Sequence, residues 1–211
     1  MTNDSVHVIE HPLVQHKLTL LRDKTLSTRG FREITHEIGA LLAYEIMRDA
    51  PTRAVEVETP LGTARGVALD GKKQVLVAIL RAGLGVLDGM LTVLPSARVG
   101  HVGLYRDPKL RTAVEYYLKL PHGMAERDVI VISSVLATGG SAAAAVRRVQ
   151  ESGARSVKFA CLIACPYGIA SFREVHPDVP IYTCAVDPEL DARGFIVPGL
   201  GDVGDRLYGT Q

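Results

Sequence analysis

A chain of 211 residues, 47% of them hydrophobic, is long enough to bury one sizeable core and rather short for two domains. Its formal net charge of +1 provides no basic excess that would attract nucleic acid or an anionic membrane, so we expect neither as a partner. No apolar run approaches the length of a membrane span, and the opening residues MTNDSVHVIEHP lack the basic start and apolar stretch of a secretory signal.

The three cysteines lie in or beside apolar runs and lack the spacing of metal ligands; they are Cys161, Cys165 and Cys184. This pattern favours buried free thiols over a metal site or disulfides. We therefore expect an unexported, cytoplasmic protein.

The first fifty residues have the apolar spacing of two amphipathic helices. The stretch HPLVQHKLTLLRDKT brings four leucines near one face, namely Leu13, Leu18, Leu20 and Leu21. The stretch FREITHEIGALLAYEIMRD carries a second apolar face. Such faces suit the chain's own sheet or a second subunit, and the sequence leaves both options open.

From residue 54 onward, apolar runs typical of strands alternate with helical segments. The expected strands are 54–60, 74–80, 98–105, 114–120, 128–133, 156–165 and 180–186, with helices near 84–94, 141–152 and 168–175. This alternation predicts an α/β fold with a mainly parallel sheet flanked by helices. Ligands of such sheets bind beyond the carboxyl ends of the strands, where ILRAGLG, GLYRD and SSVLATGGS occur.

The stretch VIVISSVLATGGS, residues 129–141, predicts a buried strand, a tight loop and a helix start. Glycine amides, the helix dipole and the hydroxyls of Thr138 and Ser141 suit a bound phosphate. The alternative is that Ser141 simply caps the helix and the glycines form an ordinary turn. No lysine follows the glycines, so the loop is not a Walker motif.

Two further segments stand out. The polar stretch 105–118 contains Pro108 and separates two strands, which predicts a flexible β-hairpin flap. The tail GFIVPGLGDVGDRLYGTQ holds five glycines and two aspartates, the composition of a main-chain ligand cradle, although a structural C-terminal wrap would also fit.

Together these motifs resemble one family, the uracil phosphoribosyltransferases. The matching pieces, in family order from about residue 11 to 210, are HPLVQHKLTLLRDK, FREI with LLAYE, ILRAGLGVLDG, VGHVGLYRD, VEYYLKLP, LATGGSA, HPDVPIYTCAVD and FIVPGLGDVGDRLYGT. The resemblance implies a type I phosphoribosyltransferase fold in one domain, 1–211. Its parts are N-terminal helices (1–50), the flap (105–118) and a base-binding tail (187–211). The implied reaction of pyrimidine salvage joins uracil to phosphoribosyl pyrophosphate and gives UMP and pyrophosphate.

The resemblance also assigns roles to single residues. Arg81 and Arg106 contact the pyrophosphate; without the resemblance, each would be interpreted as a surface charge. The phosphoribosyl group is held by Ser133, Ser134, Val135, Leu136, Ala137, Thr138, Gly139, Gly140 and Ser141, with Asp202 on the sugar-phosphate side. The main chain of Ile196, Gly201 and Val203 reads uracil. Mg²⁺ binds mainly through the substrate's pyrophosphate, with no protein metal site expected. Family members are oligomers, so we expect a homodimer or homotetramer, and some respond to GTP, which this sequence leaves open.

Three adjacent positions depart from the family pattern. Ser133 and Ser134 stand where the family has an Asp-Pro pair, and Val135 stands where Met is usual. By resemblance, the missing Asp receives the two ribose hydroxyls. A serine accepts one such bond without charge, so we expect turnover slowed roughly ten- to a hundredfold. The alternative function is a catalytically weak protein that binds phosphoribosyl pyrophosphate or UMP in a regulatory role. A purine phosphoribosyltransferase is disfavoured, because the base-reading tail matches best.

Overall fold

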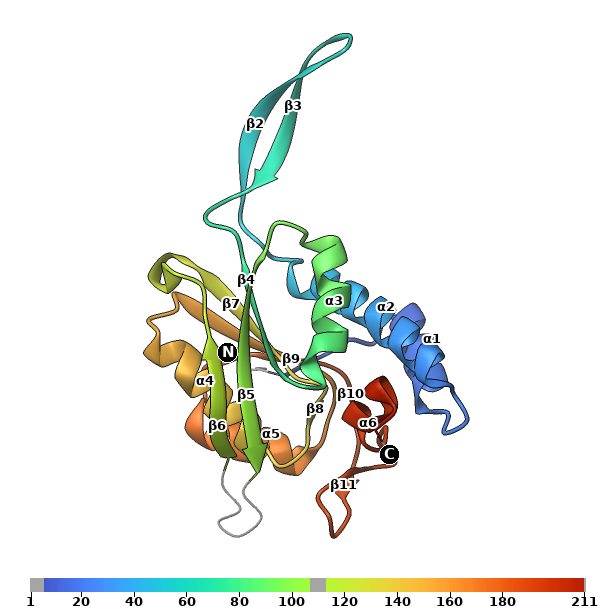
Figure 1. Cartoon of the computed structure of the whole chain (residues 1–211). Coiled ribbons are helices and arrows are strands. Elements are labelled where there is room, and N and C mark those ends of the chain that lie inside the picture. Colours follow the sequence, from blue (N-terminus) through green and yellow to red (C-terminus); the bar gives the residue numbers. More distant parts are fainter. Residues whose placement is uncertain (1–5, 107–112, 211) are drawn as a thin grey trace.

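A computed structural model describes residues 6–106 and 113–210, and a mainly parallel sheet lies at its centre (Figure 1). The strands of this sheet are β1 (Val6–Val8), β4 (Val75–Leu80), β5 (Arg98–Arg106), β6 (Ala113–Lys119), β7 (Asp128–Ile132), β8 (Val135–Leu136), β9 (Ser156–Ala164) and β10 (Ile181–Val186). Their order is β1-β10-β9-β7-β4-β5-β6, and β8 pairs with β9. Only the pair β5–β6 is antiparallel among these described strands. The predicted fold class is confirmed.

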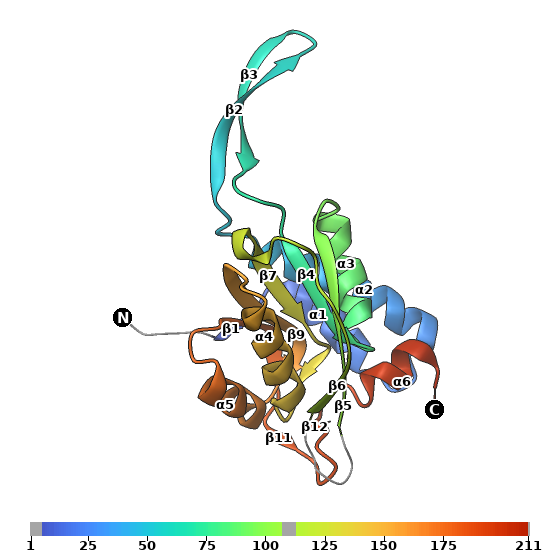
Figure 2. The same ribbon diagram turned by 60° about the vertical axis from the view of Figure 1, so that its left-hand side comes forward.

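Helices cover both faces of the sheet (Figure 2). They are α1 (Pro12–Arg22), α2 (Thr28–Ile46), α3 (Gly83–Val93), α4 (Gly140–Glu151), α5 (Pro166–Val175) and α6 (Val203–Tyr208), with a 3₁₀ turn at Met124–Glu126. Strand residues alternate between two apolar clusters, because successive side chains of a strand point to opposite faces. Leu76 and Ala78 join the cluster under α1, α2 and α3, whereas Val75 and Val77 join the cluster under α4 and α5.

The N-terminal helices pack on the sheet of their own chain. Of the two surfaces that the sequence left open for their apolar faces, the chain's own sheet is therefore one that they cover. In α1 the buried residues are Val14, Leu18 and Leu21. Leu13 and Leu20 are 44% and 43% exposed, so the expectation that they share the buried face is wrong. A helix turns about 100° per residue, and the spacing 14, 18, 21 defines its inner face.

The strand expected at 54–60 lies outside the main sheet. Residues Thr52–Thr59 form β2, which pairs only with β3 (Gly62–Leu69) among the described strands, in a hairpin that projects from the body (Figure 1). The sequence shows the reason, because valine alternates with glutamate in β2 where the central strands are continuous apolar runs. Strand β3 and the short strand β1 were not among the predicted strands.

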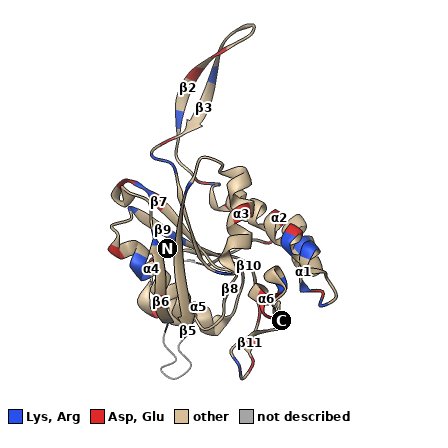
Figure 3. Ribbon diagram, in the orientation of Figure 1, with Lys and Arg blue, Asp and Glu red and all other residues tan. Residues whose placement is uncertain are grey.

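The polar surface carries charges of both signs. Lys and Arg are interspersed with Asp and Glu on the outer helices and on the hairpin β2–β3 (Figure 3). No helix among the described residues is long and apolar enough to cross a membrane.

Candidate functional site

The topology of the sheet creates a crevice between β4 and β7. These strands are parallel neighbours, yet β4 leads into α3 on one face and β7 leads through β8 into α4 on the other. The two loops therefore diverge at the carboxyl ends of the strands, which is where parallel sheets bind ligands. A cavity of about 370 Å³ lies there.

The cavity brings together three segments that are far apart in the sequence. Its wall includes residues 79–83 at the end of β4, most of the stretch 133–142, and residues 194–196 and 200–204 of the tail. Every sequence-predicted site residue lies on this wall except Arg106 and Gly140. Gly140 begins α4 between two wall residues.

The two serines lie on the cavity wall, at the end of β7. Ser133 N–H donates to the Ala160 carbonyl (2.9 Å), and the Ser134 carbonyl accepts from Leu162 N–H (3.0 Å). The chain therefore continues beside β9 into β8. Ser133 is half-buried and Ser134 is 5% exposed, so both hydroxyls lie in a partly desolvated wall.

Helix α4 begins at the cavity with an N-terminus that has no side-chain cap. Its N-cap residue is Gly139, whose φ of 83° favours glycine, and Ser141 lies inside the first turn. The interpretation of Ser141 as a cap is therefore wrong. The first amides of the twelve-residue helix and its positive dipole end face a site that suits a phosphate.

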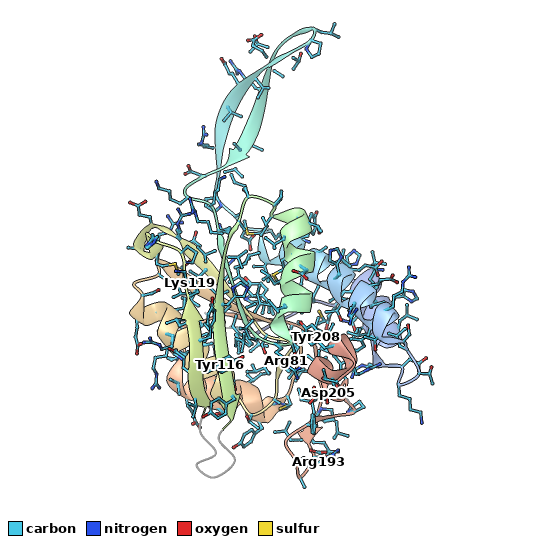
Figure 4. The ribbon with its side chains drawn as sticks, viewed as in Figure 1. Arg81, Tyr116, Lys119, Arg193, Asp205 and Tyr208 are labelled. Carbon is cyan, nitrogen blue, oxygen red and sulfur yellow. The ribbon has the colours of Figure 1, made fainter. Side chains whose placement is uncertain are left out.

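Arg81 lies at the end of β4, beside α6 (Figure 4). Its Nη2 is 3.9 Å from Asp205 Oδ1, and its guanidinium lies 5.7 Å from the centre of the Tyr208 ring. The Tyr208 hydroxyl donates to the Arg81 carbonyl (3.1 Å). The arginine side chain is 57% exposed, so the long ion pair with Asp205 restrains it only weakly and leaves the guanidinium available to an anion.

The tail presents main chain rather than side chains to the cavity. Ile196 and Val203 both lie on the cavity wall, while their side chains pack into the core cluster. Gly201 is exposed with a φ of 70°. Asp202 caps α6, because its Oδ1 accepts from Asp205 N–H at 3.0 Å. Because the side chains of Ile196 and Val203 are buried and Gly201 has none, the tail offers a ligand in the cavity mainly its backbone N–H and C=O groups.

The flap begins next to this cavity. Strands β5 and β6 form the predicted antiparallel hairpin, and Leu104 of β5 lies on the cavity wall. The backbone of Arg106 ends β5, opposite Ala113. The central flap residues 107–112 lie outside the described residues, and the role of the Arg106 side chain stays a prediction.

The cysteines are buried free thiols, as predicted, because Cys161, Cys165 and Cys184 lie in the core. Burial raises the pKa of Cys161 to about 12 and raises the pKa of Cys184 as well. Thiols of this kind are inert packing groups.

Comparison with known proteins identifies the family. The family model for uracil phosphoribosyltransferase matches residues 8–210. The chain belongs to the uracil phosphoribosyltransferase family. This membership makes it a pentosyltransferase, as the sequence predicts. Among its relatives, the uracil phosphoribosyltransferase of Rhodococcus jostii is 60% identical over 98% of this chain and 99% of its own length. The one from Legionella pneumophila is 57% identical over 100% and 99%.

Solved structures share the fold of this chain. The AQ2163 protein of Aquifex aeolicus superposes with a TM-score of 0.92 at 36% identity, covering 98% of this chain and 99% of that one. The adenine phosphoribosyltransferase of Trypanosoma brucei gives a TM-score of 0.60 at 13% identity, covering 87% and 84%. The second likeness shows the type I fold alone.

The site's donors can be tested for their fit to Mg²⁺. Asp202 is the one carboxylate among the described residues of the cavity wall. No group of three or more His, Cys, Asp or Glu side chains in the described part of the chain could hold a metal ion. Mg²⁺ binds readily through a single protein carboxylate together with substrate phosphates, so the wall fits an ion that is held mainly by a pyrophosphate.

Sequence reasoning missed residues whose roles depend on tertiary contacts. Phe195 lies on the cavity wall, and its place directly before Ile196 was the available signal. Tyr208 contacts Arg81 across 127 positions of sequence, a contact that no local pattern indicates.

Proposed function

We propose that this chain joins uracil to phosphoribosyl pyrophosphate in the cavity between β4, β7 and the tail, releasing pyrophosphate and forming UMP. The single observation that carries this proposal is that Arg81, the 133–141 loop and the 196–203 segment meet in one cavity. Family membership supports the reaction class.

In the proposed reaction, a bond forms between uracil N1 and C1′ of the ribose while the bond from C1′ to the pyrophosphate oxygen breaks. The N1–H bond of uracil also breaks, and its proton passes to the leaving pyrophosphate or to solvent. Positive charge develops on the ribose ring, and negative charge develops on the leaving group. Arg81 and the flap's Arg106 would stabilise the leaving phosphates, while the amides of 137–141 hold the 5′-phosphate. Mg²⁺, held by the pyrophosphate with help from Asp202, would neutralise part of the leaving group's charge.

Uracil would be selected by the main chain of the tail. Its edge offers an acceptor, a donor and an acceptor, which backbone N–H, C=O and N–H groups from Ile196, Gly201 and Val203 can match. Cytosine replaces one acceptor with an amine, and a donor facing a buried donor costs about 1–3 kcal/mol.

Ser133 motivates the second candidate, a weakly catalytic protein that binds the same ligands in a regulatory role. Its hydroxyl can accept a bond from a ribose hydroxyl, but it cannot offset the positive charge on C1′ as a carboxylate would. The decisive experiment is turnover of radiolabelled uracil with phosphoribosyl pyrophosphate and Mg²⁺. UMP formation supports the enzyme, whereas binding of UMP without turnover favours the regulatory protein.

The same assay has two further arms. Product formation with hypoxanthine or adenine but not uracil would overturn the choice of base. Turnover with and without GTP tests the effector that the family resemblance raises.

We also propose a homodimer or homotetramer in the cytoplasm. The hairpin β2–β3 supports the assembly, because its exposed apolar residues include Leu61 (100%) and Val67 (74%). The three buried free thiols support a reducing compartment.

A further inference from the structure

A largely buried ion pair holds the tail from behind the cavity wall. Both guanidinium nitrogens Nη1 and Nη2 of Arg22 donate to the two carboxylate oxygens of Asp187, each at 2.7 Å. The same two side chains hold the peptide of Gly199: Asp187 Oδ2 accepts from Gly199 N–H, and Arg22 Nη1 donates to the Gly199 carbonyl, each at 2.9 Å. One ion pair therefore fixes both polar groups of one residue.

Gly199 is the point where the tail turns. Its φ is 62°, and a Cβ there would lie 1.9 Å from the Ile196 carbonyl oxygen, so the chain folds back tightly. Ile196 and Gly201 lie on the cavity wall on either side of this turn, whereas Gly199, Arg22 and Asp187 do not. The ion pair thus acts on the wall without touching what the cavity would hold.

The two partners are attached to regular elements of the fold. Arg22 is the last residue of α1, whose Gln15 side chain donates to the carbonyls of Ile9 and Cys184. Asp187 follows β10, and its N–H donates to the Ala164 carbonyl at the end of β9. The tail itself has only short regular elements, namely β11 (Glu189–Leu190), β12 (Ile196–Val197) and α6. Figure 1 shows this C-terminal segment beside the N-terminal helices.

We infer that Arg22 and Asp187 are positioning residues for base recognition: by holding the Gly199 peptide, they set the main-chain groups of Ile196 and Gly201 that meet uracil. This inference rests on the proposed function. Asp187→Asn turns one accepting oxygen into an amide that faces the guanidinium, and it loosens the turn without changing its size. Binding of the base should therefore weaken, whereas binding of phosphate by the loop 137–141 should stay unchanged.

The test compares ligands that differ only in the base. UMP and ribose 5-phosphate are titrated by calorimetry into the parent and into Asp187→Asn, Arg22→Gln and Arg22→Lys, and KM is measured for both substrates. For the Asp187→Asn and Arg22→Gln variants we expect UMP affinity and uracil KM to worsen by about tenfold or more, with ribose 5-phosphate affinity changed less than about twofold. Arg22→Lys keeps the charge but loses the fork, so we expect partial retention.

The matched control is Lys17→Met. It removes another ion pair of α1, the 2.7 Å bridge to Glu37, which is more exposed than the Arg22–Asp187 pair and does not bond to Gly199. Melting curves report whether each variant folds. If Asp187→Asn does not fold, the ligand affinities of Arg22→Lys test the inference instead. Equal losses for UMP and ribose 5-phosphate, or UMP affinity equal to that of the control, would overturn the positioning role alone. A parent that binds neither UMP nor uracil would overturn the proposed function, and this inference with it.

Discussion

At the scale of single residues, Ser133 offers the most direct test of the chemistry. Its place on the cavity wall beyond β7 agrees with an expected contact to ribose. Ser133→Asp supplies a carboxylate that accepts both ribose hydroxyls and stabilises positive charge at C1′, an effect larger in the transition state than in the ground state. We expect kcat and phosphoribosyl pyrophosphate affinity to rise, on the order of tenfold in kcat/KM, in steady-state kinetics.

The neighbouring serine defines the control for this prediction. The family resemblance implies a proline at position 134, which would fix the backbone, so a lone aspartate at 133 can be misaimed. The double variant Ser133→Asp with Ser134→Pro should then succeed where the single change fails. If neither variant exceeds the parent in kcat/KM, residue 133 is not the ribose contact.

Gly201 tests whether the tail reads the base. Its φ of 70° makes any Cβ strained, but the nearest atom in the protein is Arg206 Cδ at 3.9 Å, so the new methyl group points toward open space and ligand. Gly201→Ala should weaken uracil much more than phosphoribosyl pyrophosphate, as measured by KM for each. Gly153→Ala is the matched control, since its φ of 80° imposes the same strain with no atom within 4 Å. Equal loss for both substrates would mean that the tail is structural.

At the scale of elements, α6 should contribute to binding of phosphoribosyl pyrophosphate, because it contacts Arg81. Tyr208→Phe keeps the ring beside Arg81 and removes only the hydroxyl that donates to the Arg81 carbonyl. A hydrogen bond of this kind contributes about 1 kcal/mol, so we expect phosphoribosyl pyrophosphate to bind roughly fivefold more weakly, with uracil KM unchanged. Calorimetry measures the affinity, and Tyr44→Phe on the exposed side of α2 is the control. A change in uracil KM alone would contradict this role for α6.

Elements also show why the sequence predicted some of this molecule and not the rest. The central strands and α2 to α5 were predictable, because each carries its own apolar spacing and needs no knowledge of its neighbours. Helix α6 has only six residues, including Gly204, and depends on the Asp202 cap and the burial of Leu207 in the core. The residues themselves indicated the phosphate loop and the glycine-rich tail, whereas the roles of Arg81 and of single tail residues came from the family resemblance. The ion pair between Arg22 and Asp187 spans 165 positions of sequence, and only the folded chain brings the two side chains together.

At the scale of the whole molecule, the hairpin β2–β3 is the feature that a single chain does not explain. Its valines Val57 and Val67 are exposed. Val67 pairs with Ala54 and so shares its face, and Ala54 and Val57 are three positions apart on one strand, so Val57 and Val67 lie on opposite faces. An exposed apolar hairpin lowers solubility unless another surface covers it, and a second copy of this chain is the partner that we propose for it. We therefore expect light scattering to give a multiple of 22.7 kDa at micromolar concentration.

Charge placed on the hairpin should dissociate this assembly and identify the contacting face. Val57→Glu and Val67→Glu each add a carboxylate to one face, and burying it without a partner is strongly unfavourable. The variant on the contacting face should shift the scattering mass toward 22.7 kDa, while the other should not. Leu13→Glu on the exposed side of α1 tests the competing surface of the N-terminal helices. Dissociation by Leu13→Glu alone would place the interface on those helices, and a parent that scatters only as a 22.7 kDa species would show that the hairpin joins no second copy.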